Sequence, residues 1–152
     1  MSAVPAIKAA LMEMLVGLYA DAVVSYGPPQ TLADQMVSVG NATVEHARPT
    51  AGGQTRSREE TADVEVILSC AVAGDGESYD NAQQQATEAA YAMLDTLENH
   101  FRDRNSPTLY GGCRDAIVSR HELNEYTATD AEGYTTGRIG EITATITCRT
   151  RL

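Results

Sequence analysis

The sequence predicts an α+β domain in which two helices pack on one face of a mainly antiparallel sheet. Residues 61–73 alternate side chains with the period of a strand that buries one face completely. Residues 82–101 instead gather their apolar side chains on one helical stripe. Helical and strand patterns occupy separate runs of the chain, which is typical of the α+β class. The 152 residues suit a single domain, residues 1–152.

The N-terminal part of the chain predicts a helix followed by a short extended run. Residues 6–19 carry apolar side chains at helical spacing, and Pro5 is tolerated in a first helical turn. The run 23–26 must end at Pro28 and Pro29, because proline lacks the amide donor that a strand or helix would use.

Two short strands and a long loop are expected next. Residues 36–40 and 43–47 have the composition of strands, and their inward-facing side chains are expected to be Val37, Val39 and Val44. Residues 48–60 have no apolar period and contain proline, glycine and arginine, which predicts a long exposed loop or the tip of an extended hairpin. Loops of this length in compact domains are mostly functional or disordered.

The strongest strand and the strongest helix follow one another. The strand 61–73 ends at the turn 74–76, and Ser78 or Asp80 is expected to cap the start of the helix. Small side chains at one end of the helix predict close packing on the sheet. The buried stripe is expected to contain Ala82, Ala86, Ala89, Ala90, Met93, Leu94, Leu97 and Phe101.

The last part of the chain predicts two strands, at 115–126 and 137–149, joined by a turn around 130–133. In the second strand, Ile139 is out of phase with the alternation that begins at Ile142. We therefore expect a β-bulge at Gly140.

The charge and cysteine content exclude several classes of protein. The formal net charge is −10, which argues against a protein that grips nucleic acid or an anionic membrane, because both need a positive surface. The three cysteines are far apart and in no CxxC arrangement, as expected of reduced thiols. The apolar stretch 6–19 is too short to span a bilayer and lacks the features of a secretory signal. We therefore expect a soluble protein of the cytoplasm, with no membrane partner.

The acidic, histidine and cysteine side chains do not form the pattern of a metal or anion site. Asp75, Glu77 and Asp80 are close together at the start of a helix, but their spacing does not continue as a calcium loop requires, and they would repel a phosphate. The histidines and cysteines do not occur at short metal-ligand spacing, and Cys70 and Cys148 fall on apolar strand faces. We expect neither a metal nor a cofactor.

No motif of covalent or acid–base catalysis is evident. Cys113 follows two glycines, but no histidine is near it in sequence, and it is expected to be an ordinary linker residue. His121 and Glu122 would point to opposite faces of a strand, so they cannot act as a pair. We therefore expect no catalytic residue, and the protein is predicted not to be an enzyme.

The arginines of the long loop are the candidate contact residues. Arg48, Arg56 and Arg58 lie in a segment that cannot contribute to a core, and Glu59 and Glu60 accompany them. Such a segment is either a mobile surface loop or an arm that docks on a neighbouring subunit. Under the second interpretation, Arg48, Arg56 and Arg58 are candidates for the subunit interface.

The order of these elements resembles that of the tail-terminator, or tail-completion, proteins of long-tailed bacteriophages. The resemblance covers about residues 3–150 and rests on element order rather than on a diagnostic motif. After the N-terminal helix, it follows Arg58-Glu59-Glu60-Thr61-Ala62-Asp63-Val64-Glu65-Val66, Gly74-Asp75-Gly76, the helix 83–97, Leu109-Tyr110-Gly111-Gly112, the strand 116–123 and Gly140-Glu141-Ile142.

The resemblance implies a structural virion protein with an α+β fold. Proteins of this family form a six-membered ring that caps the tail tube, stops its polymerisation and offers a surface to the head. The implied partners are further copies of the chain, the major tail tube protein and the head–tail connector protein. Genomic DNA would be met only in transit through the lumen. The implied location is the head-proximal end of the tail, reached from the host cytoplasm during assembly.

Two alternatives remain open from the sequence. The first is another morphogenesis protein of the same kind, such as a connector piece or a tail-tube subunit. The second is a small cytosolic enzyme or ligand-binding domain, which predicts a deep pocket with converging polar groups.

Overall fold

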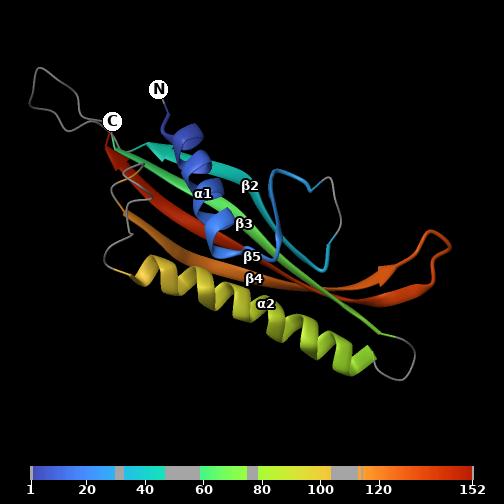
Figure 1. The fold of residues 1–152 in the computed structure, drawn as a ribbon. Helices are drawn as coiled ribbons and strands as arrows, with labels where there is room; N and C mark the ends of the chain where they lie inside the picture. Colours follow the sequence, from blue (N-terminus) through green and yellow to red (C-terminus); the bar gives the residue numbers. More distant parts are fainter. Residues whose placement is uncertain are drawn as a thin grey trace, which may run out of the picture.

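A five-stranded sheet is the frame of the molecule (Figure 1). The structure is a computed structural model that describes residues 2–29, 33–46, 59–74, 79–103, 113 and 115–151. The spatial order is β1-β2-β3-β5-β4; only β1 and β2 pair in parallel, and the other neighbours are antiparallel. The strands are β1 (Val23–Tyr26), β2 (Gln35–His46), β3 (Glu59–Ala73), β4 (Asp115–Thr129) and β5 (Thr135–Arg151).

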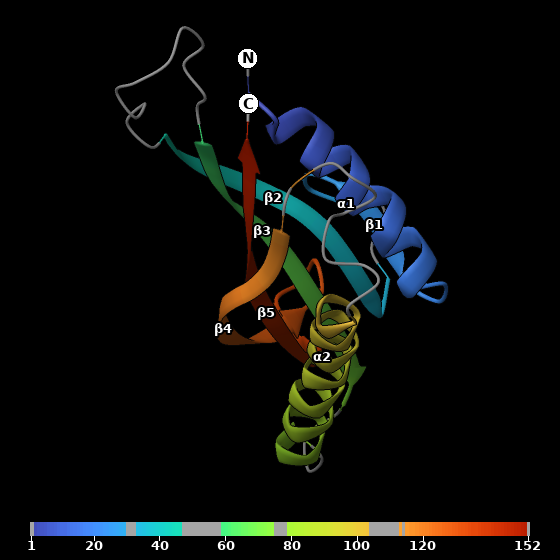
Figure 2. The same ribbon diagram turned by 90° about the vertical axis from the view of Figure 1, so that its left-hand side faces the viewer.

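Two helices, α1 (Val4–Leu18) and α2 (Tyr79–Arg102), lie on the same side of this sheet (Figure 2). Their buried side chains join those of the strands in a single apolar core. α1 packs against β1 and β2, whereas α2 packs against β3, β5 and β4. The hydroxyl of Tyr19, just after α1, donates a hydrogen bond of 2.6 Å to the carbonyl of Met93 in α2. The predicted fold class is therefore confirmed.

The N-terminus of α1 is held by a carboxylate from the sheet. Pro5 lies in the first turn, as expected. Glu60 is fully buried, and its Oε1 accepts hydrogen bonds of 2.9 Å from the Ser2 hydroxyl and from the Ala3 amide. This satisfies donors that a helix start leaves free. The prediction that the exposed loop continues to residue 60 was wrong, because β3 already begins at Glu59.

One bent strand replaces the two short strands that were expected over 36–47. β2 is continuous, and its pairing with β3 shifts register between Val39 and Ala42. The local irregularity explains the break in the sequence pattern. Val37 and Val39 are buried as predicted, and Val44 is partly buried against the core.

The prediction of a β-bulge at Gly140 was wrong. The β3–β5 ladder runs in unbroken register through the Cys70–Gly140 pair, so Ile139 simply lies on the opposite face. The glycine is required for another reason: a Cβ at this position would lie 2.7 Å from the Ala86 carbonyl oxygen of α2. The backbone of the helix therefore lies close against the sheet here, as its small residues predicted.

The turn of the β4–β5 hairpin lies at the end of the sheet that is farthest from the chain termini (Figure 1). Its turn was predicted correctly. The Asp130 carboxylate accepts hydrogen bonds of 3.0 and 2.9 Å from the amides of Glu132 and Tyr134. Gly133 has φ +86°, a conformation that side-chain-bearing residues rarely adopt. The turn is thus rigidly defined by side-chain and backbone contacts.

Candidate functional site

The face of the sheet opposite the helices is uncovered in the described part of the chain; we call it the open face. Alternate residues of β3 and β5 point to it, mostly threonines and carboxylates. Thr147 Oγ1 donates to Asp63 Oδ1 at 2.7 Å and lies 2.8 Å from Ser119 Oγ of β4. Arg149 pairs with Asp115 at 2.9 Å. The open face is therefore an ordered polar surface rather than an exposed core.

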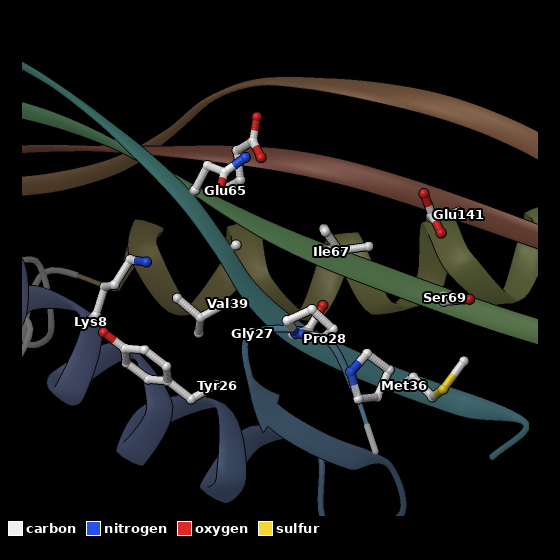
Figure 3. A pocket seen from close by; sticks show the side chains of 14 residues that line it. Lys8, Tyr26, Gly27, Pro28, Met36, Val39, Glu65, Ile67, Ser69 and Glu141 are labelled. Atoms are coloured by element: carbon white, nitrogen blue, oxygen red, sulfur yellow. The ribbon is translucent and has the colours of Figure 1, made fainter. Parts of the chain in front are cut away.

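An open groove of about 460 Å³ lies where the open face meets the short edge strand β1 (Figure 3). We call it the edge groove. β1 pairs with only four residues of β2, and the chain turns away at Gly27. The lining is mainly apolar and comes from five elements and the turn after β1: Lys8, Tyr26, Gly27, Pro28, Pro29, Met36, Ser38, Val39, Gly40, Asn41, Glu65, Ile67, Ser69 and Glu141.

Three charged side chains border the edge groove. Lys8 reaches from α1 over the Tyr26 ring, with its Nζ 5.2 Å from the ring centre. Glu65 of β3 lies over Gly40, where a Cβ would be 3.4 Å from its Oε2. Glu141 of β5 accepts a hydrogen bond of 3.4 Å from the Tyr126 hydroxyl, and its negative charge raises the pKa of that tyrosine. The groove thus offers a cation on one side and carboxylate acceptors on the other.

The described surface also exposes several large apolar side chains. Tyr134, at the end of the β4–β5 turn, is 73% exposed, and Ile117 on the open face is 55% exposed. Val16 of α1 is exposed as well. Single exposed apolar residues are common, so Tyr134 stands out through its rigid turn rather than through its exposure alone.

The sequence-predicted interface residues Arg48, Arg56 and Arg58 lie outside the described residues, as do Asp75 and Glu77. The candidate arm is therefore located only by the strands that it joins, β2 and β3.

The histidines do not meet the cysteines. His121 Nε2 is 3.3 Å from the Tyr91 hydroxyl on α2, so it does not approach Cys113. Its neighbour Glu122 pairs with Thr143 on the other face, which confirms the predicted opposite orientation. In the part of the chain that the structure describes, no group of three or more His, Cys, Asp or Glu could hold a metal ion.

Cys113 lies just before β4, outside any helix or strand, which agrees with its prediction as a linker residue. It is buried and hydrogen-bonded to Cys148, a contact that lowers the pKa of the Cys113 thiol. The same contact, together with burial, raises the pKa of Cys148. No sequence pattern could reveal this pairing, because the two thiols meet only when β4 pairs with β5.

The fold and surfaces define a two-layer α+β domain with one helix-covered face and one open polar face. No described helix is long and apolar enough to cross a membrane. No protein-family model matches the chain, and a search of curated proteins gives no match.

Proposed function

We propose that this chain is a structural virion protein of a long-tailed bacteriophage, which caps the tail tube as a six-membered ring. The ring ends tube polymerisation and offers the surface on which the head is joined. The observation that carries the proposal is the order of elements along the chain, which resembles that of tail-terminator proteins. Helix α1, the β2–β3 hairpin, the long helix α2 and the β4–β5 hairpin follow one another in that order.

The surface chemistry supports a structural role over a catalytic one. The lining of the edge groove contains neither histidine nor cysteine. The open face consists of side chains bonded to one another across strands. Both features suit protein contact better than bond-making chemistry.

The net charge of −10 suits a conduit for DNA. A like-charged wall disfavours adhesion of a polyanion in transit. This part of the proposal is contradicted if a structure of the ring has a basic inner wall.

The partners of the proposed ring are neighbouring copies, the major tail tube protein and the head–tail connector protein. The place of action is the head-proximal end of the tail, after assembly in the host cytoplasm. Arg48, Arg56 and Arg58 are proposed as contacts between subunits. Ring formation and tail completion that both survive Arg56→Ala with Arg58→Ala would remove the last two from the interface.

One observation favours a second candidate function. The edge groove has the volume of a small-molecule site, which suits a ligand-binding domain. This candidate ranks below the structural one because the groove is wide open and its lining holds neither histidine nor cysteine. A connector or tube role is a third possibility; tube subunits polymerise by themselves, whereas a terminator stops at a closed ring.

The decisive experiment is deletion of the reading frame from its parent genome, followed by negative-stain electron microscopy of the lysate. Tails of excessive, uncontrolled length beside unattached filled heads are expected. Wild-type protein from a plasmid should restore virions, and Gly17→Ala, which adds a methyl group where nothing lies within 4 Å, should restore them equally. Normal tails with detached heads would make the protein a joining piece. Complete virions would reject both structural roles.

A further inference from the structure

We infer that the turn of the β4–β5 hairpin in one subunit docks into the edge groove of the next, in a head-to-tail contact between copies of this chain. This inference rests on the proposed function, because it names the contact that would build the ring. It starts from two features at different places on one molecule: an exposed aromatic side chain on a rigid turn and an apolar groove that the described residues leave open.

The feature that inserts is the segment 130–134, which we call the hairpin tip. Two hydrogen bonds to the Asp130 carboxylate fix its backbone, and a further pair links Asp130 with Tyr134 at 2.9 Å and with Gly133 at 3.1 Å. Tyr134 is 73% exposed. A buried tyrosine contributes a large contact area at low entropic cost, the more so when its backbone is already ordered.

The feature that receives the tip is the apolar part of the edge groove. Pro28, Met36 and Ile67 give it an apolar surface on which an aromatic ring can pack. They come from the turn after β1, from β2 and from β3, so the site exists only in the folded subunit. In Figure 3, Pro28 and Ile67 lie between Lys8 on the left and Glu141 on the right, and Met36 lies below Glu141. A volume of about 460 Å³ leaves room for a tyrosine side chain and part of its turn.

One pair of opposite charges can form between the two features, from Lys8 of the groove and Glu132 of the tip. Lys8, the only lysine in the sequence, borders the groove, and the hairpin tip carries Glu132. The Asp130 carboxylate is occupied within the turn, so Glu132 is the anion available to Lys8. The Tyr134 hydroxyl is a donor, and Glu65 and Glu141 are acceptors at the other side of the groove. The inferred contact therefore places Glu132 beside Lys8, away from the two carboxylates, and the Tyr134 hydroxyl beside a carboxylate.

The two features differ and lie on the same chain, so the contact is heterologous. Such contacts build closed rings when the rotation between neighbours closes, and open filaments when it does not. A contact between identical surfaces would instead stop at a dimer. The inferred contact is thus of the kind that a ring of identical subunits requires.

The test is self-association of the full chain followed by nitrogen-15 NMR from ~20 μM to ~1 mM, a range that detects dissociation constants up to the millimolar level. We expect concentration-dependent shifts at both the hairpin tip and the edge groove. Tyr134→Ser should weaken the association about tenfold or more, as removal of a central aromatic contact does. Ile117→Ser, a matched loss of an exposed apolar side chain outside both features, should leave it unchanged.

Mixing two variants separates a head-to-tail contact from a symmetric one. Tyr134→Ser retains an intact groove, and Met36→Glu retains an intact tip. Neither should self-associate, but in a mixture the groove signals of labelled Tyr134→Ser should shift. If Met36→Glu loses the dispersed spectrum of the folded protein, Lys8→Glu takes its place.

Three results would overturn the inference: no shifts in the wild type up to ~1 mM, shifts confined to other surfaces, or undiminished association of Tyr134→Ser. Failure of the contact is distinguishable from failure of the proposed function. Overlong tails after gene deletion with no contact between tip and groove would reject only the contact. Complete virions after deletion with a proven contact would reject only the phage role.

Discussion

Gly140 permits the close approach between α2 and the sheet, and Gly140→Ala tests that role directly. The added Cβ would lie 2.7 Å from the Ala86 carbonyl oxygen, 2.8 Å from its carbonyl carbon and 2.9 Å from the Thr87 amide nitrogen. All three atoms belong to the helix backbone, so no side-chain rotation can relieve the contact. The helix must move outward by several tenths of an ångström.

The cost of Gly140→Ala follows from two opposing effects. Overpacking of a tight core contact costs about 1–3 kcal/mol. The lower entropy of the unfolded chain with alanine returns about 0.4–1 kcal/mol. We expect a net loss of about 1–2 kcal/mol, and a Tm lower by about 2–8 °C for a domain of this size.

Urea unfolding followed by circular dichroism measures this loss, with an unchanged slope showing that the extent of unfolding is the same. Gly17→Ala is the matched control, because Gly17 lies within α1 with nothing within 4 Å of the added methyl group. It should be neutral or stabilising by about 0.5 kcal/mol. If Gly140→Ala is as stable as the wild type, the helix is not held against the sheet as described, and the explanation of this glycine is wrong.

Three further substitutions test contacts that hold the helices and the hairpin. Glu60→Ala removes the acceptor of the Ala3 amide, and we expect a loss of about 1–3 kcal/mol in urea unfolding; a loss below ~0.5 kcal/mol contradicts a capping role. Tyr19→Phe removes the bond to the Met93 carbonyl and should cost about 1 kcal/mol at neutral pH. Burial raises the pKa of Tyr19, so its contribution is complete below about pH 10 and is lost as the pH rises through the folded-state pKa. The stability difference between wild type and variant should therefore shrink in alkaline solution, and a constant difference would refute this. Asp130→Ala removes two bonds within the hairpin turn and should lower the free energy of unfolding by about 1 kcal/mol; an unchanged Tm would show that the turn does not depend on this carboxylate.

The elements with a clear period were predictable, and their irregular neighbours were not. β3 and α2 bury one face each over many residues, so alternation and helical spacing identified them. The bulge was wrongly predicted at Gly140 because a glycine within a strand indicates either a bulge or a close approach of another backbone. Only the position of α2 decides between the two, and α2 is separated from Gly140 in the sequence by the whole of β4. Glu60 was wrongly assigned to the exposed loop because a carboxylate is rarely buried without a partner that satisfies it. Its hydrogen-bond partners are at the start of α1, which is distant in the sequence.

The candidate site was far less predictable than the fold. The edge groove joins residues from α1, from four strands and from the turn after β1. Its sole local signal was the Pro28-Pro29 pair, which indicated only that a strand ends. The hairpin tip was predicted as a turn, but nothing in sequence could show that Tyr134 projects from it. The arginines chosen as contacts were identified by composition, and they fall outside the described residues.

The pairing of β3 with β5 along the whole length of β3 has a consequence for the synthesis and folding of the chain. Helix α2 and strand β4 lie between these two strands in the chain. During synthesis at about 5–20 residues per second, β3 therefore waits for several seconds without its central neighbour. A fold dominated by such distant pairings also forms slowly. The central pairing of the sheet is therefore made only after α2 and β4 have been synthesised, so the N-terminal half of the domain cannot complete its fold by itself.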